Sequence, residues 1–176
     1  IARAVAAAHS VGVLHKDLKP ANVLIAAASV ANTGWEVRLT DFGSSRILGP
    51  ERLAQLGLST RAMVAAHGAD TSGGGTPLYL APELLAGQPA TTGSDVYALG
   101  LMLYQLLVGD FRRPMSTGWE RDIHDPLLVQ GLRAATEGNP EDRLASAAEL
   151  IERLNTLEAR RAEQATEHII RDAETA

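Results

Sequence analysis

Three short segments of this sequence carry the side chains best suited to chemistry. They occupy residues 15–22, 41–43 and 75–83 and read His15-Lys16-Asp17-Leu18-Lys19-Pro20-Ala21-Asn22, Asp41-Phe42-Gly43 and Gly75-Thr76-Pro77-Leu78-Tyr79-Leu80-Ala81-Pro82-Glu83. Carboxylates accept protons and hydrogen bonds, and carboxylate and amide oxygens are the donors that hard divalent cations prefer. Any single aspartate or asparagine is more often an ordinary turn residue. The chemical interpretation therefore depends on the order and spacing of all three segments.

The placement of lysine is unusual in this chain. Of the sixteen basic residues only Lys16 and Lys19 are lysines, and both lie in the first segment. A lysine ammonium is a compact point charge, whereas an arginine guanidinium is a planar fork of donors. Their position indicates a chemical demand for an ammonium, and chance placement of two lysines is the alternative.

In this order and spacing the segments resemble the catalytic loop, the metal-binding motif and the substrate-platform motif of protein kinases. The resemblance is to the C-terminal lobe of eukaryotic-like serine/threonine kinases of the bacterial type. It implies transfer of the γ-phosphate of ATP to serine or threonine hydroxyls of protein substrates. Residues 1–157 are expected to form the lobe and residues 158–176 a charged helical tail or linker.

The resemblance assigns a chemical role to five residues. Asp17 corresponds to the catalytic aspartate that accepts the proton of the substrate hydroxyl, and Lys19 to the lysine that contacts the transferring phosphate. Asn22 and Asp41 correspond to the ligands of Mg²⁺, for which Mn²⁺ is an alternative. Thr76 corresponds to the platform threonine that bonds the catalytic aspartate and lysine, which implies a hydroxyl amino acid as acceptor.

The same resemblance assigns supporting roles to six further residues, which are His15, Phe42, Gly43, Glu83, Asp95 and Arg143. His15 is expected to pack against residues 41–43 and to hold their backbone. Glu83 is expected to pair with Arg143, and Asp95 to anchor the catalytic loop from the core helix.

Several parts of the kinase pattern are missing or altered. The sequence contains no G-x-G-x-x-G stretch, no strand resembling Val-Ala-Ile-Lys and no upstream helix with a paired glutamate. The expectation is therefore a C-terminal lobe without its N-terminal lobe, which would be required in cis for ATP binding. Lys16 replaces the arginine that usually clamps a phosphate with two parallel bonds. Thr71 and Ser72 are candidate phosphosites, with plain spacers of a glycine-rich loop as the alternative.

Two other functions compete with the protein kinase interpretation. A pseudokinase acting as a binding scaffold is disfavoured by the intact Asp17, Lys19, Asn22 and Asp41. A small-molecule phosphotransferase of the aminoglycoside kinase type shares the aspartate and asparagine, but Lys19 and residues 81–83 disfavour it.

The elements that would position these residues are mainly helical. Apolar spacing predicts helices at residues 1–10, 92–108 and 127–136, and another that starts at Ser146 and runs out into solvent beyond residue 158. Short strands are predicted at residues 11–14, 23–25 and 37–40, where β-hairpins would carry the catalytic and metal-binding loops. The fold class is thus mainly α and protein-kinase-like.

Composition removes several other classes of protein. The chain has 176 residues, a net charge of −5 and 45% apolar residues, which describes a globular domain without the basic face that nucleic-acid binding requires. Because it contains no cysteine, disulfides and thiolate chemistry are excluded. The longest apolar run, residues 96–108, is too short for a membrane span. A cytoplasmic location is expected, and alanine and arginine enrichment with scarce lysine fits a high-GC bacterial genome.

Overall fold

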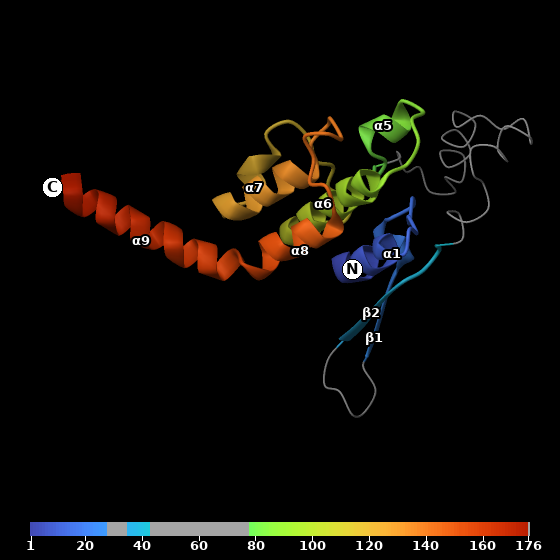
Figure 1. Ribbon diagram of the computed structural model, residues 1–176, viewed down its shortest axis with the longest axis horizontal. Coiled ribbons are helices and arrows are strands. Elements are labelled where there is room, and N and C mark those ends of the chain that lie inside the picture. The colour runs from blue at the N-terminus through green and yellow to red at the C-terminus, as the bar shows by residue number, and fades with distance from the viewer. Residues whose placement is uncertain (28–34, 43–77, 176) are drawn as a thin grey trace, which may run out of the picture.

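The computed structural model describes residues 1–27, 35–42 and 78–175. Helices surround one central helix, a two-stranded hairpin projects from them, and a long helix runs to the C-terminus (Figure 1). The elements are α1 (Ala2–Ser10), η1 (Pro20–Asn22), β1 (Val23–Ala27), β2 (Trp35–Leu39), α5 (Pro82–Leu85), α6 (Thr92–Val108), η2 (Trp119–Asp122), α7 (Pro126–Ala135), α8 (Ala147–Asn155) and α9 (Leu157–Thr175).

Helix α6 is the centre of the hydrophobic core. Its first turn is closed by a hydrogen bond from the Thr91 backbone N–H to Ser94 Oγ at 3.1 Å. It ends where Gly109 adopts a left-handed conformation with φ 77°, which glycine reaches without steric cost. Between these ends α6 contacts α1, α7 and α8. The predicted core helix is confirmed, as are the predicted helices at residues 1–10 and 127–136.

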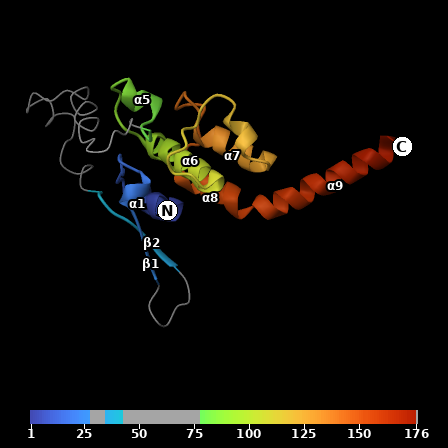
Figure 2. The ribbon, with the colours of Figure 1, turned by 180° about the vertical axis from the view of Figure 1, so that it is seen from behind.

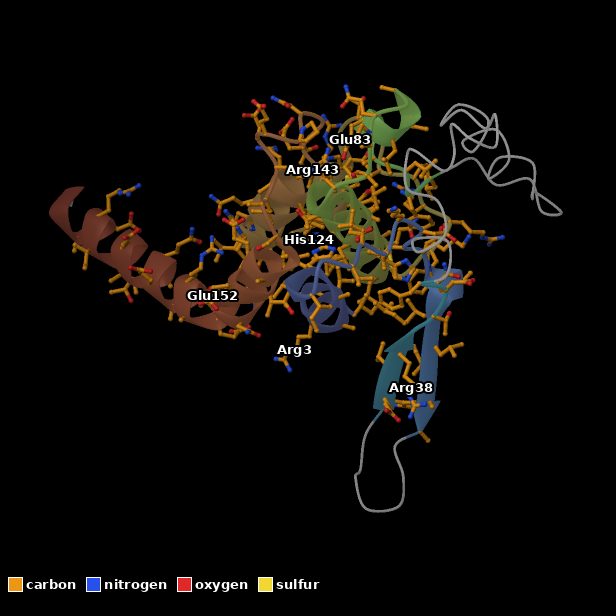
Figure 3. The ribbon with its side chains drawn as sticks, turned by 45° about the vertical axis from the view of Figure 1, so that its right-hand side comes forward. Arg3, Arg38, Glu83, His124, Arg143 and Glu152 are labelled. Atoms are coloured by element: carbon orange, nitrogen blue, oxygen red, sulfur yellow. The ribbon has the colours of Figure 1, made fainter. Side chains whose placement is uncertain are left out.

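The hairpin of β1 and β2 continues directly from the first chemical segment. The strands pair antiparallel with Val23 opposite Leu39, and these two side chains pack against the core. From there the hairpin leads away from the helices, as the position of Arg38 in Figure 3 shows. Two of the predicted strands are therefore confirmed.

The predicted strand at residues 11–14 is wrong. The N–H groups of Val11 and Val13 both donate to the Ala8 carbonyl, and Gly12 has φ 75°, so this segment is the turn that ends α1. A backbone that bonds back onto its own helix has no N–H groups left for a sheet. Within the described residues there is one hairpin, not several.

The C-terminal region forms two helices where the sequence predicted a continuous one. Ser146 Oγ accepts the Glu149 N–H at 3.2 Å, as expected for the start of α8. The helix ends at Asn155, and its C-cap Thr156 has φ −90° and ψ 2°, with its hydroxyl donating to the Glu152 carbonyl at 2.8 Å. The separate helix α9 then extends away from the body (Figure 2).

The first turns of α9 are tied to α7. Arg161 Nε donates to Asp125 Oδ2 at 2.7 Å, and Arg160 Nη2 donates to Gln130 Oε1 at 2.7 Å. Asp125 also accepts the N–H groups of Leu127 and Leu128 as the N-cap of α7. The start of α9 therefore has a defined direction relative to the core. Among the described helices, none combines the length and apolarity that crossing a membrane would need.

Candidate active site

Residues 17–22 bring three of the predicted functional side chains together. The Lys19 ammonium lies 2.9 Å from Asp17 Oδ2. Asn22 Nδ2 donates to Asp17 Oδ2 at 3.1 Å and to the Asp17 carbonyl at 2.7 Å. The short helix η1 starts with Pro20, whose fixed φ favours a helical turn, and this turn brings Asn22 back onto Asp17. The result is a polar cluster in which an acid, an ammonium and an amide are in direct contact.

The hairpin places Asp41 at the same end as Asn22. The Thr40 N–H donates to the Asn22 carbonyl at 2.9 Å, which extends the antiparallel register of β1 and β2 by one pair. Asp41 is therefore one residue beyond the position opposite Asn22. It has φ 65°, a left-handed conformation that aspartate tolerates better than most residues. The two predicted metal-binding residues thus lie at the same end of the hairpin.

His15 connects the first two segments. Its ring is fully buried, Nε2 donates to the Thr40 carbonyl at 2.9 Å, and the ring centroid lies 4.6 Å from that of Phe42. Because a carbonyl only accepts, Nε2 carries the proton, and Nδ1 receives a long contact of 3.4 Å from the Asp17 N–H. His15 is thus used in packing and backbone hydrogen bonds.

Asp95 joins the first of the three segments, residues 15–22, to the core helix. Its Oδ2 accepts the His15 N–H and its Oδ1 accepts the Lys16 N–H, both at 2.8 Å. The side chain is 2% exposed. Lys16 has φ 69°, a conformation that costs about 1–2 kcal/mol for a residue with a Cβ. The carboxylate therefore holds a strained turn immediately before Asp17.

Asp95 has a third donor that the sequence did not indicate. His9 Nε2 lies 2.8 Å from Asp95 Oδ2, and the two residues are 86 positions apart. His9 stands on α1, outside the three segments. The residue spacing contained no local signal for this contact.

Glu83 and Arg143 form a buried bidentate ion pair. Arg143 Nη1 and Nη2 donate to Glu83 Oε1 and Oε2 at 2.7 and 2.9 Å, and Figure 3 shows the two residues side by side. Ser94 Oγ also donates to Glu83 Oε1, at 2.9 Å. Burial raises the pKa of the Glu83 carboxyl. This effect is outweighed by hydrogen bonds from Arg143, from the Glu83 backbone N–H and from Ser94, together with the positive charge of Arg143, so the pKa of Glu83 lies below its usual value. This pair fastens α5 to α6 and to the segment before α8.

Four of the predicted residues lie outside the part of the chain that the structure describes. They are Gly43, Thr71, Ser72 and Thr76.

Comparison with known proteins identifies the family. The sequence matches the model of the protein kinase domain over residues 1–168. The chain belongs to the protein kinase domain family. It is 38% identical to the serine/threonine-protein kinase PkaA of Streptomyces coelicolor over 143 residues, which are 80% of this chain and 22% of PkaA. It is 34% identical to the serine/threonine-protein kinase PknD of Protochlamydia amoebophila over an alignment of 187 residues, which covers 99% of this chain and 17% of PknD.

A solved kinase domain shares this fold. The crystal structure of the PknI kinase domain of Mycobacterium tuberculosis superimposes with a TM-score of 0.58 at 28% identity. The superposition covers 88% of this chain and 50% of the PknI kinase domain. The chain thus spans about a fifth of the two curated kinases and half of the solved kinase domain.

Proposed function

We propose that the protein containing this chain is a serine/threonine protein kinase that transfers the γ-phosphate of ATP to hydroxyls of protein substrates. The observation that carries the proposal is the contact of Asp17 with both Lys19 and Asn22, with Asp41 at the same end of the hairpin as Asn22. Relatives named as serine/threonine-protein kinases support the same activity.

Asp17 is the group that we assign to the acceptor hydroxyl. Its contacts with Lys19 and Asn22 are both made by Oδ2, and we assign the substrate hydroxyl to Oδ1. A carboxylate there orients the hydroxyl for attack and accepts its proton. Lys19, beside it, can neutralise charge on the transferring phosphate.

The oxygen donors of Asn22 and Asp41 fit a hard divalent cation such as Mg²⁺. The side-chain nitrogen of Asn22, Nδ2, donates to Asp17. The side-chain oxygen of Asn22, Oδ1, is therefore the atom that can act as a metal ligand. Together with a charged Asp41 oxygen it forms the kind of neutral and anionic donor set that Mg²⁺ shares with ATP phosphates. The ion supplies charge neutralisation between the phosphates when bound. Because ATP is the phosphoryl donor, we place the reaction in the cytoplasm.

We further propose that residues 1–157 correspond to the C-terminal lobe and that an N-terminal lobe in cis completes the site. The described hairpin supports this, because its core-facing side continues outward as exposed apolar residues, which are Ile25 at 65%, Val37 at 43% and Trp35 at 76% exposure. Apolar side chains in a continuous row favour coverage by another part of the protein. This chain alone is then expected to be inactive.

The test uses the full-length protein and its Asp17→Asn variant. With labelled ATP and Mg²⁺, the wild-type protein should phosphorylate casein on serine or threonine, and Asp17→Asn should lose at least about a hundredfold in kcat. Glu36→Gln, on the exposed hairpin, removes one carboxylate charge as a matched control and should retain activity.

The other outcomes separate the competing functions. Full activity of Asp17→Asn would remove Asp17 as the base. Nucleotide binding without turnover by the wild-type protein would favour a scaffold, and transfer to an aminoglycoside but not to casein would favour a small-molecule phosphotransferase.

A further inference from the structure

His9 makes a buried contact that connects the first helix to the proposed catalytic loop. Its Nε2 is 2.8 Å from Asp95 Oδ2, and the two side chains are 8% and 2% exposed. The chemistry proposed above does not use this histidine. Helix α1 also packs on α6 and α8, which keeps the imidazole within reach of Asp95.

Asp95 receives three donors from two different elements. His15 N–H and His9 Nε2 both approach Oδ2, while Lys16 N–H approaches Oδ1. A buried carboxylate is stable only when such donors compensate for lost hydration. Removing the His9 donor therefore weakens the anchor that holds the left-handed turn at Lys16.

We propose that His9 is a positioning residue for phosphoryl transfer, because its hydrogen bond orients the Asp95 carboxylate that holds the backbone of His15 and Lys16 and thereby places Asp17. This inference rests on the proposed kinase function. The chain of contacts runs from α1 through α6 to the residue directly before Asp17.

The hydrogen bond defines which feature of His9 matters. A carboxylate accepts, so Nε2 is the donating nitrogen. The other nitrogen, Nδ1, is buried and has no hydrogen-bond partner among the described residues. The ring thus serves to hold one N–H donor, on Nε2, far enough from the α1 backbone to reach Asp95 Oδ2. Glutamine can present an amide N–H at a similar distance, whereas the shorter asparagine side chain cannot.

The experiment compares His9→Asn and His9→Gln in the full-length protein. Both variants introduce a neutral amide, so they differ mainly in the reach of the donor. His9→Asn should lower kcat by about ten- to a hundredfold at saturating ATP and casein, since small misplacements of reacting groups have effects of this size. Its KM for ATP should stay within about twofold, and His9→Gln should recover kcat to within about threefold of wild type. Ser10→Ala, at the exposed neighbouring position, is the control and should leave kcat unchanged.

Two measurements distinguish positioning from folding. The fraction of folded protein is determined by circular dichroism and thermal unfolding, and kcat is expressed per folded molecule. Unchanged kcat in folded His9→Asn would overturn the proposal, and so would an equal loss in His9→Gln and His9→Asn. Should His9→Asn fail to fold, a loss of kcat in His9→Gln as large as that in Asp17→Asn would also overturn it. Absence of transfer by the wild-type protein would instead refute the kinase function itself.

Discussion

Replacing Arg143 by methionine would leave the Glu83 carboxylate buried without its guanidinium partner. The side chains of Arg143 and Glu83 are 0% and 3% exposed. Methionine retains much of the volume but none of the donors, and Ser94 Oγ would be the remaining side-chain donor to Glu83. Removing one partner of a buried ion pair costs about 3–5 kcal/mol.

A matched control comes from an exposed ion pair. Arg133 and Glu120 are 3.0 Å apart, and their side chains are 63% and 36% exposed. Exposed pairs contribute about 0–1 kcal/mol because water and salt screen them. Arg133→Met should therefore lower the free energy of unfolding far less than Arg143→Met, although both remove one charge of the same kind.

The contribution of Glu83 to the free energy of unfolding should change with pH in opposite directions in the wild type and in Arg143→Met. In the wild type the pKa of Glu83 is below its usual value of 4.5, so the stabilisation is present above that pH and is lost as the pH falls through the lower folded-state pKa. In Arg143→Met the guanidinium hydrogen bonds and the positive charge are gone, so burial should outweigh the hydrogen bonds that remain and raise the pKa of Glu83; the penalty for burying its charged form then grows as the pH rises above 4.5. The difference in free energy of unfolding between the wild type and Arg143→Met should therefore become smaller as the pH falls.

Urea unfolding can measure these differences with one fluorescent reporter. The chain contains two tryptophans. Trp119 packs edge-on against the buried Tyr104, while Trp35 is exposed on the hairpin and can be replaced by phenylalanine. Equal destabilisation by Arg143→Met and Arg133→Met would refute this prediction. A difference in free energy of unfolding between wild type and Arg143→Met that becomes larger at low pH would also refute it.

Two further substitutions test the packing of α6 and the attachment of α9. A Cβ at Gly100 would lie 2.6 Å from Thr136 Cγ2, so Gly100→Ala should destabilise the protein by about 1–3 kcal/mol. A Cβ at Gly131 would meet nothing within 4 Å, so Gly131→Ala should be neutral or stabilising. Equal melting temperatures for the two variants would contradict this prediction. Arg161→Ala should speed hydrogen exchange in α9 without lowering core stability, and unchanged exchange would show that the bond to Asp125 does not hold the helix. Burial raises the pKa of Asp125, but its backbone donors and Arg161 outweigh burial and keep that pKa below the usual 3.8, so the attachment should weaken only as the pH falls below that value.

Local sequence patterns predicted the elements whose stability is local. The apolar spacing before Gly109 predicted the end of α6, and Ser146 predicted the start of α8. The short apolar runs at residues 23–25 and 37–40 predicted the two strands of the hairpin, at one end of which Asn22 and Asp41 lie. These features depend on periodicity and capping, which short windows of sequence contain.

The strand predicted at residues 11–14 and the continuous C-terminal helix were wrong because the backbone conformation at a single residue changed the outcome. Residues 11–14 are apolar enough for a strand, but the left-handed Gly12 turns their N–H groups back onto α1. Helix α8 ends where the Thr156 backbone turns to φ −90° and ψ 2°, whereas the apolar spacing around it resembles that of an uninterrupted helix.

Taken alone, the sequence determined the family resemblance, the order of the chemical segments and most of the helices, because all of these depend on residue type and short spacing. Only the tertiary structure decided which distant groups share a carboxylate. Asp95 meets His9, His15 and Lys16 across 79 to 86 positions. That meeting depends on how α1 packs against α6, since burial of apolar side chains from both helices in one core sets the distance between His9 and Asp95.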